Sequence, residues 1–168
     1  MTRALRAVLT AIGAAMILFD APGAASARPL DVGHSARTAG LPPITTTCVG
    51  KRPGGRWSPC FKFTSRAFGE TWLRWGFQDP SDPRRGFGVR HIERSHPELR
   101  PLRRSTELAI AYVTYYGHAA GGRGTTEVWE GKDTKGKGWR VILSGRIDRA
   151  DPYHERVGVV SAFRIRLK

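Results

Sequence analysis

The sequence predicts an α+β domain in which helices come first and an antiparallel sheet follows. Apolar residues recur at helical spacing in the middle of the chain, whereas segments rich in β-branched and aromatic residues, separated by Gly, Lys and Asp, follow Gly124. The 168 residues are enough for one domain. The 5 Trp, 4 Tyr and 7 Phe residues provide the large apolar side chains that a packed core needs.

Residues 1–27 have the pattern of a secretory signal peptide. Two arginines precede an apolar run from Ala7 to Phe19, and the small residues Ala25-Ser26-Ala27 offer a cleavage site. An uncleaved membrane anchor is the alternative, but the run is shorter than the roughly 20 residues that a membrane span needs. We therefore expect a secreted, extracellular protein that starts at Arg28 and has no transmembrane segment in the mature chain.

Residues 28–47 mix Pro, Gly, Ser and Thr without a hydrophobic period, which predicts a flexible or extended lead-in. The single folded domain is expected over residues 48–168. The chain has two cysteines, Cys48 and Cys60, and in an oxidising compartment they are expected to form a disulfide. A catalytic thiol is the alternative, but the neighbouring residues include no base that would activate it.

Three helices are expected in the first part of the domain. Aromatic residues at i, i+4 and i+7 predict a helix within Thr64–Gly76 (Phe68, Trp72, Trp75). A second helix is expected from Gly88 to the residue before Pro97. A third begins near Ser105, a suitable N-cap, and ends at about His118.

The second part of the domain is expected to be a sheet. The segments Thr125–Glu130, Gly138–Gly145 and Val157–Leu167 have the composition of strands. Gly131–Gly138 is expected to form a hairpin loop, and Asp148–Tyr153 a turn. Alternation along the second of these strands predicts that Arg140, Ile142 and Ser144 share one face, which is the candidate floor of a cleft. Alternation along the last strand predicts that Val159, Ser161 and Phe163 share a face.

The charge of the chain points to an anionic partner. Lys and Arg number 28 against 14 Asp and Glu, which gives a formal net charge of +14. A field of this strength raises the rate of encounter with nucleic acid, anionic membranes or acidic polymers. Charge alone does not choose among these partners.

The segment Gly86–Pro97 holds two histidines within six residues. If the segment is helical, five residues at about 100° each place the two rings about 140° apart. His91 then falls among polar and cationic residues, where a solvated surface histidine is the alternative to a functional one. His96 follows the apolar positions Val89 and Ile92, where it could simply pack or cap the helix.

Acid–base chemistry on a phosphodiester suits this segment better than metal binding. Neither histidine has a second ligand at i+4, and no familiar zinc spacing is present, so no metal and no cofactor are expected. A histidine can remove or return a proton near neutral pH while arginines hold a phosphate. The charges of Arg90 and Arg94 are expected to lower the pKa of the imidazoles.

The motif GFGVRHIERSHPEL, followed by a helix and by the strand elements GWRVILSGRI and VGVVSAF, resembles the barnase, EndoU, colicin and RelE superfamily of nucleases, which includes many bacterial toxin domains. The resemblance covers roughly Phe68 to Arg164. It implies helices before a curved antiparallel sheet that forms the RNA cleft, and cleavage without a metal. His91 matches the family histidine, and Ser161 matches a Ser or Thr of the last core strand. The basic strand position matches either Arg140 or Arg146.

The resemblance therefore implies a secreted toxin-type ribonuclease that cleaves RNA by attack of the ribose 2′-OH on the adjacent phosphate. RNA is the expected partner, and a neutralising immunity protein is a further candidate partner. The expected catalytic residues are His91, Arg140, Ser161 and His96. The expected substrate-binding residues are Arg90, Arg94, Arg146 and Arg164. For Ser161, a buried structural role is an equal alternative.

A non-enzymatic secreted cationic protein explains charge, export and a disulfide equally well. Such a protein would bind nucleic acid, a cell-wall polymer or an anionic membrane, and it would need no chemistry from the histidines. The two functions differ in whether His91 faces a basic groove or open solvent.

Overall fold

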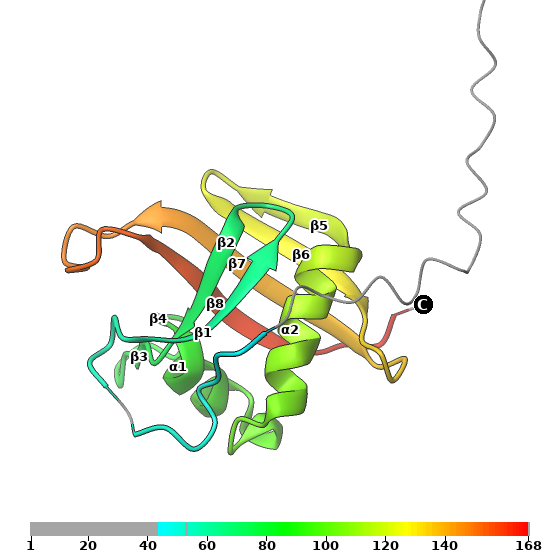
Figure 1. The fold of residues 1–168 in the computed structure, drawn as a ribbon, viewed down its shortest axis with the longest axis horizontal. Coiled ribbons are helices and arrows are strands. Elements are labelled where there is room, and N and C mark those ends of the chain that lie inside the picture. Colours follow the sequence, from blue (N-terminus) through cyan, green and yellow to red (C-terminus); the bar gives the residue numbers. More distant parts are fainter. Residues whose placement is uncertain (1–43, 53, 168) are drawn as a thin grey trace, which may run out of the picture. The chain divides into compact units, whose positions relative to one another are not determined.

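The computed structural model describes residues 44–52 and 54–167 (Figure 1). The predicted signal peptide and residues 28–43 of the predicted lead-in lie outside the described residues. The described elements follow in the order β1 (Pro59–Ser65), β2 (Gly69–Arg74), β3 (Phe77–Gln78), β4 (Gly86–Phe87), α1 (Gly88–Ser95), the 3₁₀ turn η2 (Pro97–Leu99), α2 (Arg104–Tyr116), β5 (His118–Arg123), β6 (Thr126–Lys132), β7 (Gly138–Ile147) and β8 (Arg156–Arg164). No helix within these residues is both long and apolar enough to cross a membrane. The predicted α+β class is confirmed.

The main sheet has the strand order β5-β6-β7-β8, and all neighbouring strands are antiparallel. Trp129, Val141 and Ala162 lie side by side on three adjacent strands, and all three are buried. These side chains form part of the apolar face of the sheet. The alternation predicted for β7 is confirmed from Trp139 to Leu143, because Trp139, Val141 and Leu143 are buried whereas Arg140 and Ile142 are partly exposed. Ser144, predicted to share the face of Arg140 and Ile142, is buried.

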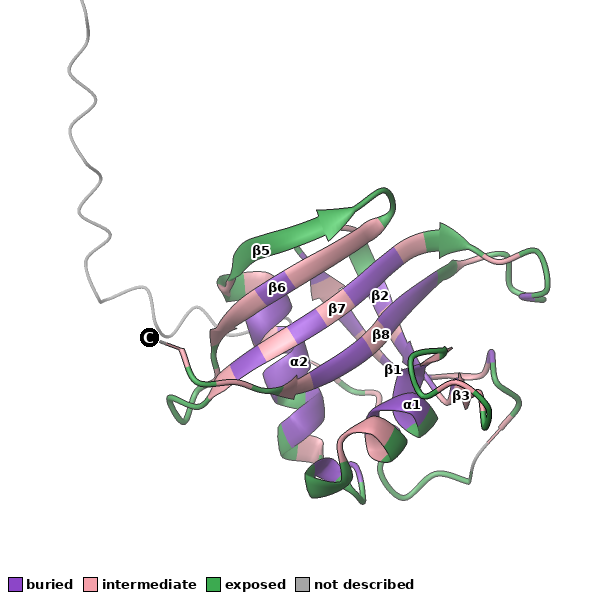
Figure 2. Cartoon of the chain, turned by 180° about the vertical axis from the view of Figure 1, so that it is seen from behind, coloured by how far each residue is buried: buried purple, intermediate pink, exposed green. Residues whose placement is uncertain are grey.

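Helix α2 and the β1–β2 hairpin cover the apolar face. The two opposite views in Figure 1 and Figure 2 place both on the same side of the sheet. Ala109, Ile110 and Val113 of α2 join the same buried cluster as Phe61 of β1 and Val141 of β7. Burying an Ile or Val side chain contributes about 1.5–3 kcal/mol, so the packing of α2 and β1 on this face stabilises the domain.

The predicted helix over Thr64–Gly76 is wrong, because this region forms the end of β1, a turn and β2. Aromatic residues at helical spacing occur here by coincidence. The burial pattern instead has a period of two, with Phe61 and Phe63 buried and Lys62 and Thr64 partly exposed. Gly69 has φ +68°, a left-handed conformation that glycine adopts without strain, and it closes the hairpin where a helix was expected.

The other predicted elements are found with shifted ends. The second and third predicted helices are α1 and α2, and the three predicted strands are β6, β7 and β8. The sequence did not predict β5, whose residues His118–Arg123 (HAAGGR) are all exposed and include no β-branched or aromatic side chain. An edge strand pairs through its backbone and needs no apolar face, so its sequence carries no strand signal.

The packed domain begins before Cys48. Arg104 donates hydrogen bonds to the backbone oxygens of Ile44 and Thr46. The wholly buried carboxylate of Glu107 accepts hydrogen bonds from the Thr47 hydroxyl, at 2.7 Å, and from the Cys48 N–H. The end of the predicted lead-in is therefore held against α2.

The structure contains the predicted disulfide between Cys48 and Cys60, and both cysteines are buried. We expect non-reducing mass spectrometry of the purified protein to show a mass two hydrogens below that of the reduced chain. Replacing both cysteines by Ala should lower the free energy of unfolding by about 2–3 kcal/mol, because the unfolded chain regains the entropy of a short loop. Two thiols that alkylate in denaturant without a reductant would contradict this prediction.

Candidate active site

The face of the main sheet opposite to α2 carries polar and partly exposed side chains. Figure 2 shows β5 to β8 from this side, with α2 behind the sheet. In register, Glu130, Arg140 and Phe163 form one row across the strands, and Val128, Ile142 and Ser161 form the next row. We call this surface of β6, β7 and β8 the open face.

Helix α1 ends against the open face at His96. The His96 N–H donates to the Ile92 oxygen at 2.8 Å and closes the helix. The imidazole stacks on Phe163, with ring centroids 4.7 Å apart and planes inclined by 20°. His96 Nε2 lies 3.4 Å from the Ser161 hydroxyl. The structure thus brings together His96 and Ser161, two of the four predicted catalytic residues.

His91 is buried, with 7% of its surface exposed, so the alternative of a solvated surface histidine is wrong. Helix α1 contacts β8 as well as β3 and β4, so elements pack against it on more than one side. His91 Nδ1 lies 2.6 Å from the Gln78 side-chain oxygen and 3.5 Å from the Ser95 hydroxyl. His91 therefore does not face open solvent, and its Nδ1 is engaged within the chain.

The Gln78 side chain fixes the proton on the His91 ring. Its amide nitrogen donates to three backbone oxygens, at 3.0 Å, 3.2 Å and 3.1 Å (Asp79, Asp82, Arg85). The amide oxygen therefore faces His91, and since this oxygen only accepts, Nδ1 must carry the hydrogen. In the neutral ring, Nε2 then holds the lone pair and is the nitrogen that can act as a base.

The two glycines of the GFG motif allow α1 to approach β2 and β3 closely. A Cβ on Gly86 would lie 2.7 Å from His91 Nδ1, and a Cβ on Gly88 would lie 2.4 Å from the Arg74 oxygen. Gly88 also has φ +75°, which favours glycine. The motif thus positions the His91 ring through backbone geometry.

Burial lowers the pKa of both histidines. For His91, burial is the larger cause, and the positive charge of protonated His96 lowers its pKa further. For His96, burial lowers the pKa while the carboxylate of Glu98 opposes this shift. The predicted cause, the charges of Arg90 and Arg94, is wrong, because neither arginine contributes and both lie exposed on α1.

The other predicted arginines lie in different places. Arg140 is on the open face, where Nε donates to Glu130 at 2.6 Å and the guanidinium lies 5.9 Å from the Phe163 ring centre. Arg146 is exposed and forms an ion pair with Asp148 at 3.2 Å. Arg164 lies over the Trp139 ring and points to the other side of the sheet. Of the predicted substrate-binding arginines, Arg90 and Arg94 lie on α1 and Arg164 lies on the other side of the sheet, so these three are not on the open face.

A bulge changes the faces predicted for β8. The register shifts between Ile142 and Leu143, so that Ser161 pairs with Ile142 while Val159 pairs with Leu143 in the core. The expectation that Val159 shares a face with Ser161 is therefore wrong. Ser161 itself is 4% exposed, and its hydroxyl contacts His96.

Sequence reasoning missed Gln78 and Glu130. Gln78 lies in a two-residue strand, and its role depends on backbone oxygens of a turn, which no spacing in the sequence reveals. Glu130 was assigned to a strand end, but its pairing with Arg140 follows from the β6–β7 register. The position of Glu130 could have been found by aligning the two predicted strands about their hairpin loop.

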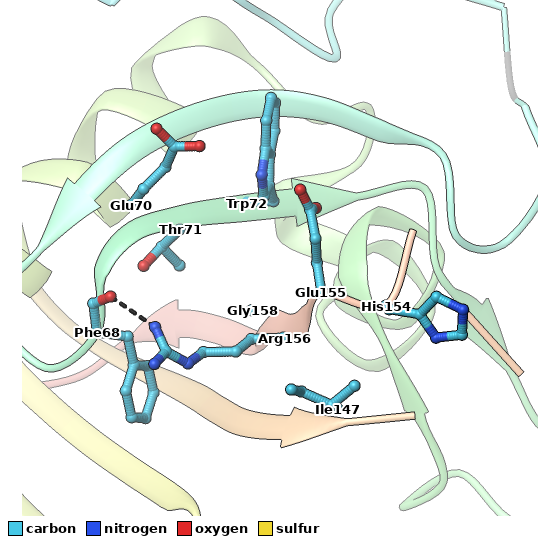
Figure 3. A pocket seen from close by; sticks show the side chains of 9 residues that line it. All are labelled: Phe68, Glu70, Thr71, Trp72, Ile147, His154, Glu155, Arg156 and Gly158. Carbon is cyan, nitrogen blue, oxygen red and sulfur yellow. Dashed lines mark hydrogen bonds between the residues drawn. The ribbon is translucent and has the colours of Figure 1, made fainter. Parts of the chain in front are cut away.

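A separate cavity of about 270 Å³ lies between β2 and the ends of β7 and β8 (Figure 3). Its charged side chains are already engaged within the chain. Arg156 donates to the Phe68 oxygen at 2.8 Å, Glu155 pairs with Arg74, and Glu70 pairs with Lys62. We therefore assign no function to this cavity.

Comparisons of the chain with protein-family models, with curated proteins and with solved structures found no match.

Proposed function

We propose that the protein is a secreted, toxin-type ribonuclease that cleaves RNA by transesterification through the ribose 2′-OH and uses no cofactor. The observation that carries the proposal is the pair of histidines of the GFGVRHIERSHPEL motif, of which His91 is hydrogen-bonded to Gln78 while His96 lies against Ser161 and Phe163 on the open face. Gln78 holds His91 in the tautomer of a base. His96 lies beside a hydroxyl at an open sheet face in a chain of net charge +14.

In the proposed reaction, His91 Nε2 takes the proton of the 2′-OH while its oxygen attacks phosphorus. The bond from phosphorus to the 5′-oxygen breaks, and protonated His96 gives a proton to that leaving oxygen. Glu98 lies 3.9 Å from His96 Nδ1 and favours the protonated form. A proton on His96 in turn favours neutral His91, so the two roles support each other.

Arg140 and Ser161 are placed to stabilise the phosphate during this step. Ser161 can donate its hydroxyl hydrogen to a phosphate oxygen, and Arg140 can offer the guanidinium N–H groups that Glu130 leaves free. The pairing with Glu130 also holds Arg140 in position before substrate arrives. Arg90 and Arg94 on the exposed side of α1 would contact the RNA backbone.

Substitution of Gln78 by Glu tests the assignment of His91 as the base. A carboxylate next to Nδ1 favours the imidazolium and raises the pKa of His91. Because the base must be neutral, the acid side of the pH–rate profile should move to higher pH, as measured by initial rates across about pH 5 to 8. Gln78→Leu, which removes the acceptor without adding charge, should slow cleavage without this movement. If the acid side of the pH–rate profile is the same in Gln78→Glu as in the parent protein, the assignment of His91 as the base is contradicted.

Binding to RNA should depend strongly on salt. Each Lys or Arg that contacts a phosphate releases counterions, so the affinity should fall by about 10³-fold between 50 and 200 mM salt if about six phosphates are engaged. Fluorescence anisotropy with an oligonucleotide that lacks the 2′-OH measures binding without cleavage. An affinity that stays constant over this range would remove the electrostatic part of the proposal.

A non-enzymatic cationic binding protein remains the second candidate, because the burial of His91 also fits a structural histidine. Incubation of the purified protein with total RNA and with DNA separates the two. The ribonuclease should degrade RNA and leave DNA intact, because DNA has no 2′-OH. Binding of both polymers without any RNA cleavage between about pH 5 and 8 would favour the binding protein.

A further inference from the structure

A cavity of about 530 Å³ lies between the β3–β4 hairpin and the open face. Ile142 and Ser144 of β7 line one side, and Phe77 and Gly86 of the hairpin line the other. Its volume lies in the range of pockets that hold small organic ligands. Its surface combines apolar, hydroxyl and charged side chains.

Two residues that line this cavity are neighbours of the surroundings of the histidines. Ile142 is paired in register with Ser161, whose hydroxyl contacts His96. Gly86 lies against His91, because a side chain there would collide with Nδ1. Residues that line the cavity are thus direct neighbours of His91 and of the serine that contacts His96.

The charged groups of the cavity are arranged for a ligand with an anionic part and a polar, uncharged part. Arg85 and Arg146 are exposed at its rim and can meet an anion. Asp79 lines the same cavity, and hydrogen bonds from Ser81 keep the pKa of its carboxyl below the ordinary value. An ionised Asp79 repels phosphate but accepts hydrogen bonds from N–H groups.

Phe77 adds an aromatic surface. It is half-buried, and Phe87 supports it edge-on, with ring centroids 5.5 Å apart and planes inclined by 80°. Arg56 lies 5.8 Å from the centre of the same ring. The ring is therefore held in place before a ligand binds, which is the property that makes aromatic side chains effective platforms for nucleobases.

We propose that this cavity binds one unpaired nucleobase of single-stranded RNA, next to the phosphate that the histidines cleave. This inference rests on the proposed function. The base stacks on Phe77 with an amino edge toward Asp79, and the adjoining phosphate meets Arg85 and Arg146. A base inside a duplex is stacked on both faces and cannot enter, so the substrate is single-stranded.

The test uses the full chain and a short fluorescent 2′-O-methyl RNA of A and C residues, which lacks the attacking hydroxyl and is not cleaved. Affinities are measured by anisotropy for the single strand and for its duplex with the complementary strand. Phe77→Leu keeps apolar volume but removes the ring, and Thr126→Trp fills the cavity without changing charge. The matched controls are Phe68→Leu and Thr64→Trp, which change half-buried residues outside this cavity.

We expect Phe77→Leu and Thr126→Trp each to weaken single-strand binding by about fivefold or more, since stacking of one base contributes about 1–3 kcal/mol. The controls should bind like the parent, and the duplex should bind more weakly than the single strand. Parent-like binding by both cavity variants, or equal binding of single strand and duplex, would overturn the inference. Since the probe is not cleaved, failure of unmodified RNA to be cut would refute the nuclease while leaving the result for this cavity intact.

Discussion

RNA cleavage by a His91→Gln variant is expected to be about 10² to 10⁴ times slower than cleavage by the parent protein, because a positioned general base contributes this much to the rate. Gln is chosen because His91 is buried, and a smaller side chain would leave a cavity beside Gln78. Single-turnover rates with saturating enzyme separate this effect from binding. The affinity for an uncleavable RNA should change little.

His154→Asn is the matched control for this experiment. His154 is an exposed histidine in the turn before β8 and has φ 49°, a conformation that Asn tolerates. It should cleave RNA at the parental rate. If His91→Gln cleaves as fast as this control, the assignment of His91 as the base fails.

The second large effect concerns stability. Arg74→Met should lower the free energy of unfolding by about 3–5 kcal/mol, because it leaves a buried carboxylate without its cation. Arg74 and Asp151 are both wholly buried and lie 3.3 Å apart, and Arg74 also donates to Glu155 at 3.0 Å and to the Trp57 oxygen. This ion pair joins β2 to the turn before β8.

Urea unfolding of Arg74→Met and Arg146→Met measures this difference. Arg146 forms an exposed ion pair with Asp148, and exposed pairs contribute about 0–1 kcal/mol. The same substitution should therefore be nearly neutral at position 146. Equal losses in the free energy of unfolding would contradict the expectation that the buried Arg74–Asp151 pair stabilises the domain more than the exposed pair does.

The elements that were predicted correctly are those in which the apolar residues occupy the buried positions. In β7, burial alternates from Trp139 to Leu143, and in α1 the apolar positions Val89 and Ile92 are buried. The β1–β2 hairpin was missed because three aromatic residues fell at helical spacing, although Phe61 and Phe63 alternate with polar residues. Strand β5 was missed because it is exposed throughout.

The site could be predicted only in part. The short motif around His91 and His96 singled out both histidines, but their surroundings depend on chain segments far away in sequence. His96 meets Ser161 across 65 positions, a contact that depends on how α1 packs against β8. The hydrogen bond between His91 and Gln78 depends on how the β3–β4 hairpin folds back on α1, which sequence spacing does not encode.

The most direct test of the proposed mechanism is the chemical nature of the new RNA ends. Purified protein is incubated with a defined oligonucleotide, with and without EDTA, and the products are analysed by mass spectrometry. Attack by the 2′-OH predicts one product with a 2′,3′-cyclic phosphate and one with a 5′-hydroxyl, with unchanged yield in EDTA, because no metal-activated water takes part. Products with a 5′-phosphate, or cleavage that EDTA abolishes, would contradict the mechanism.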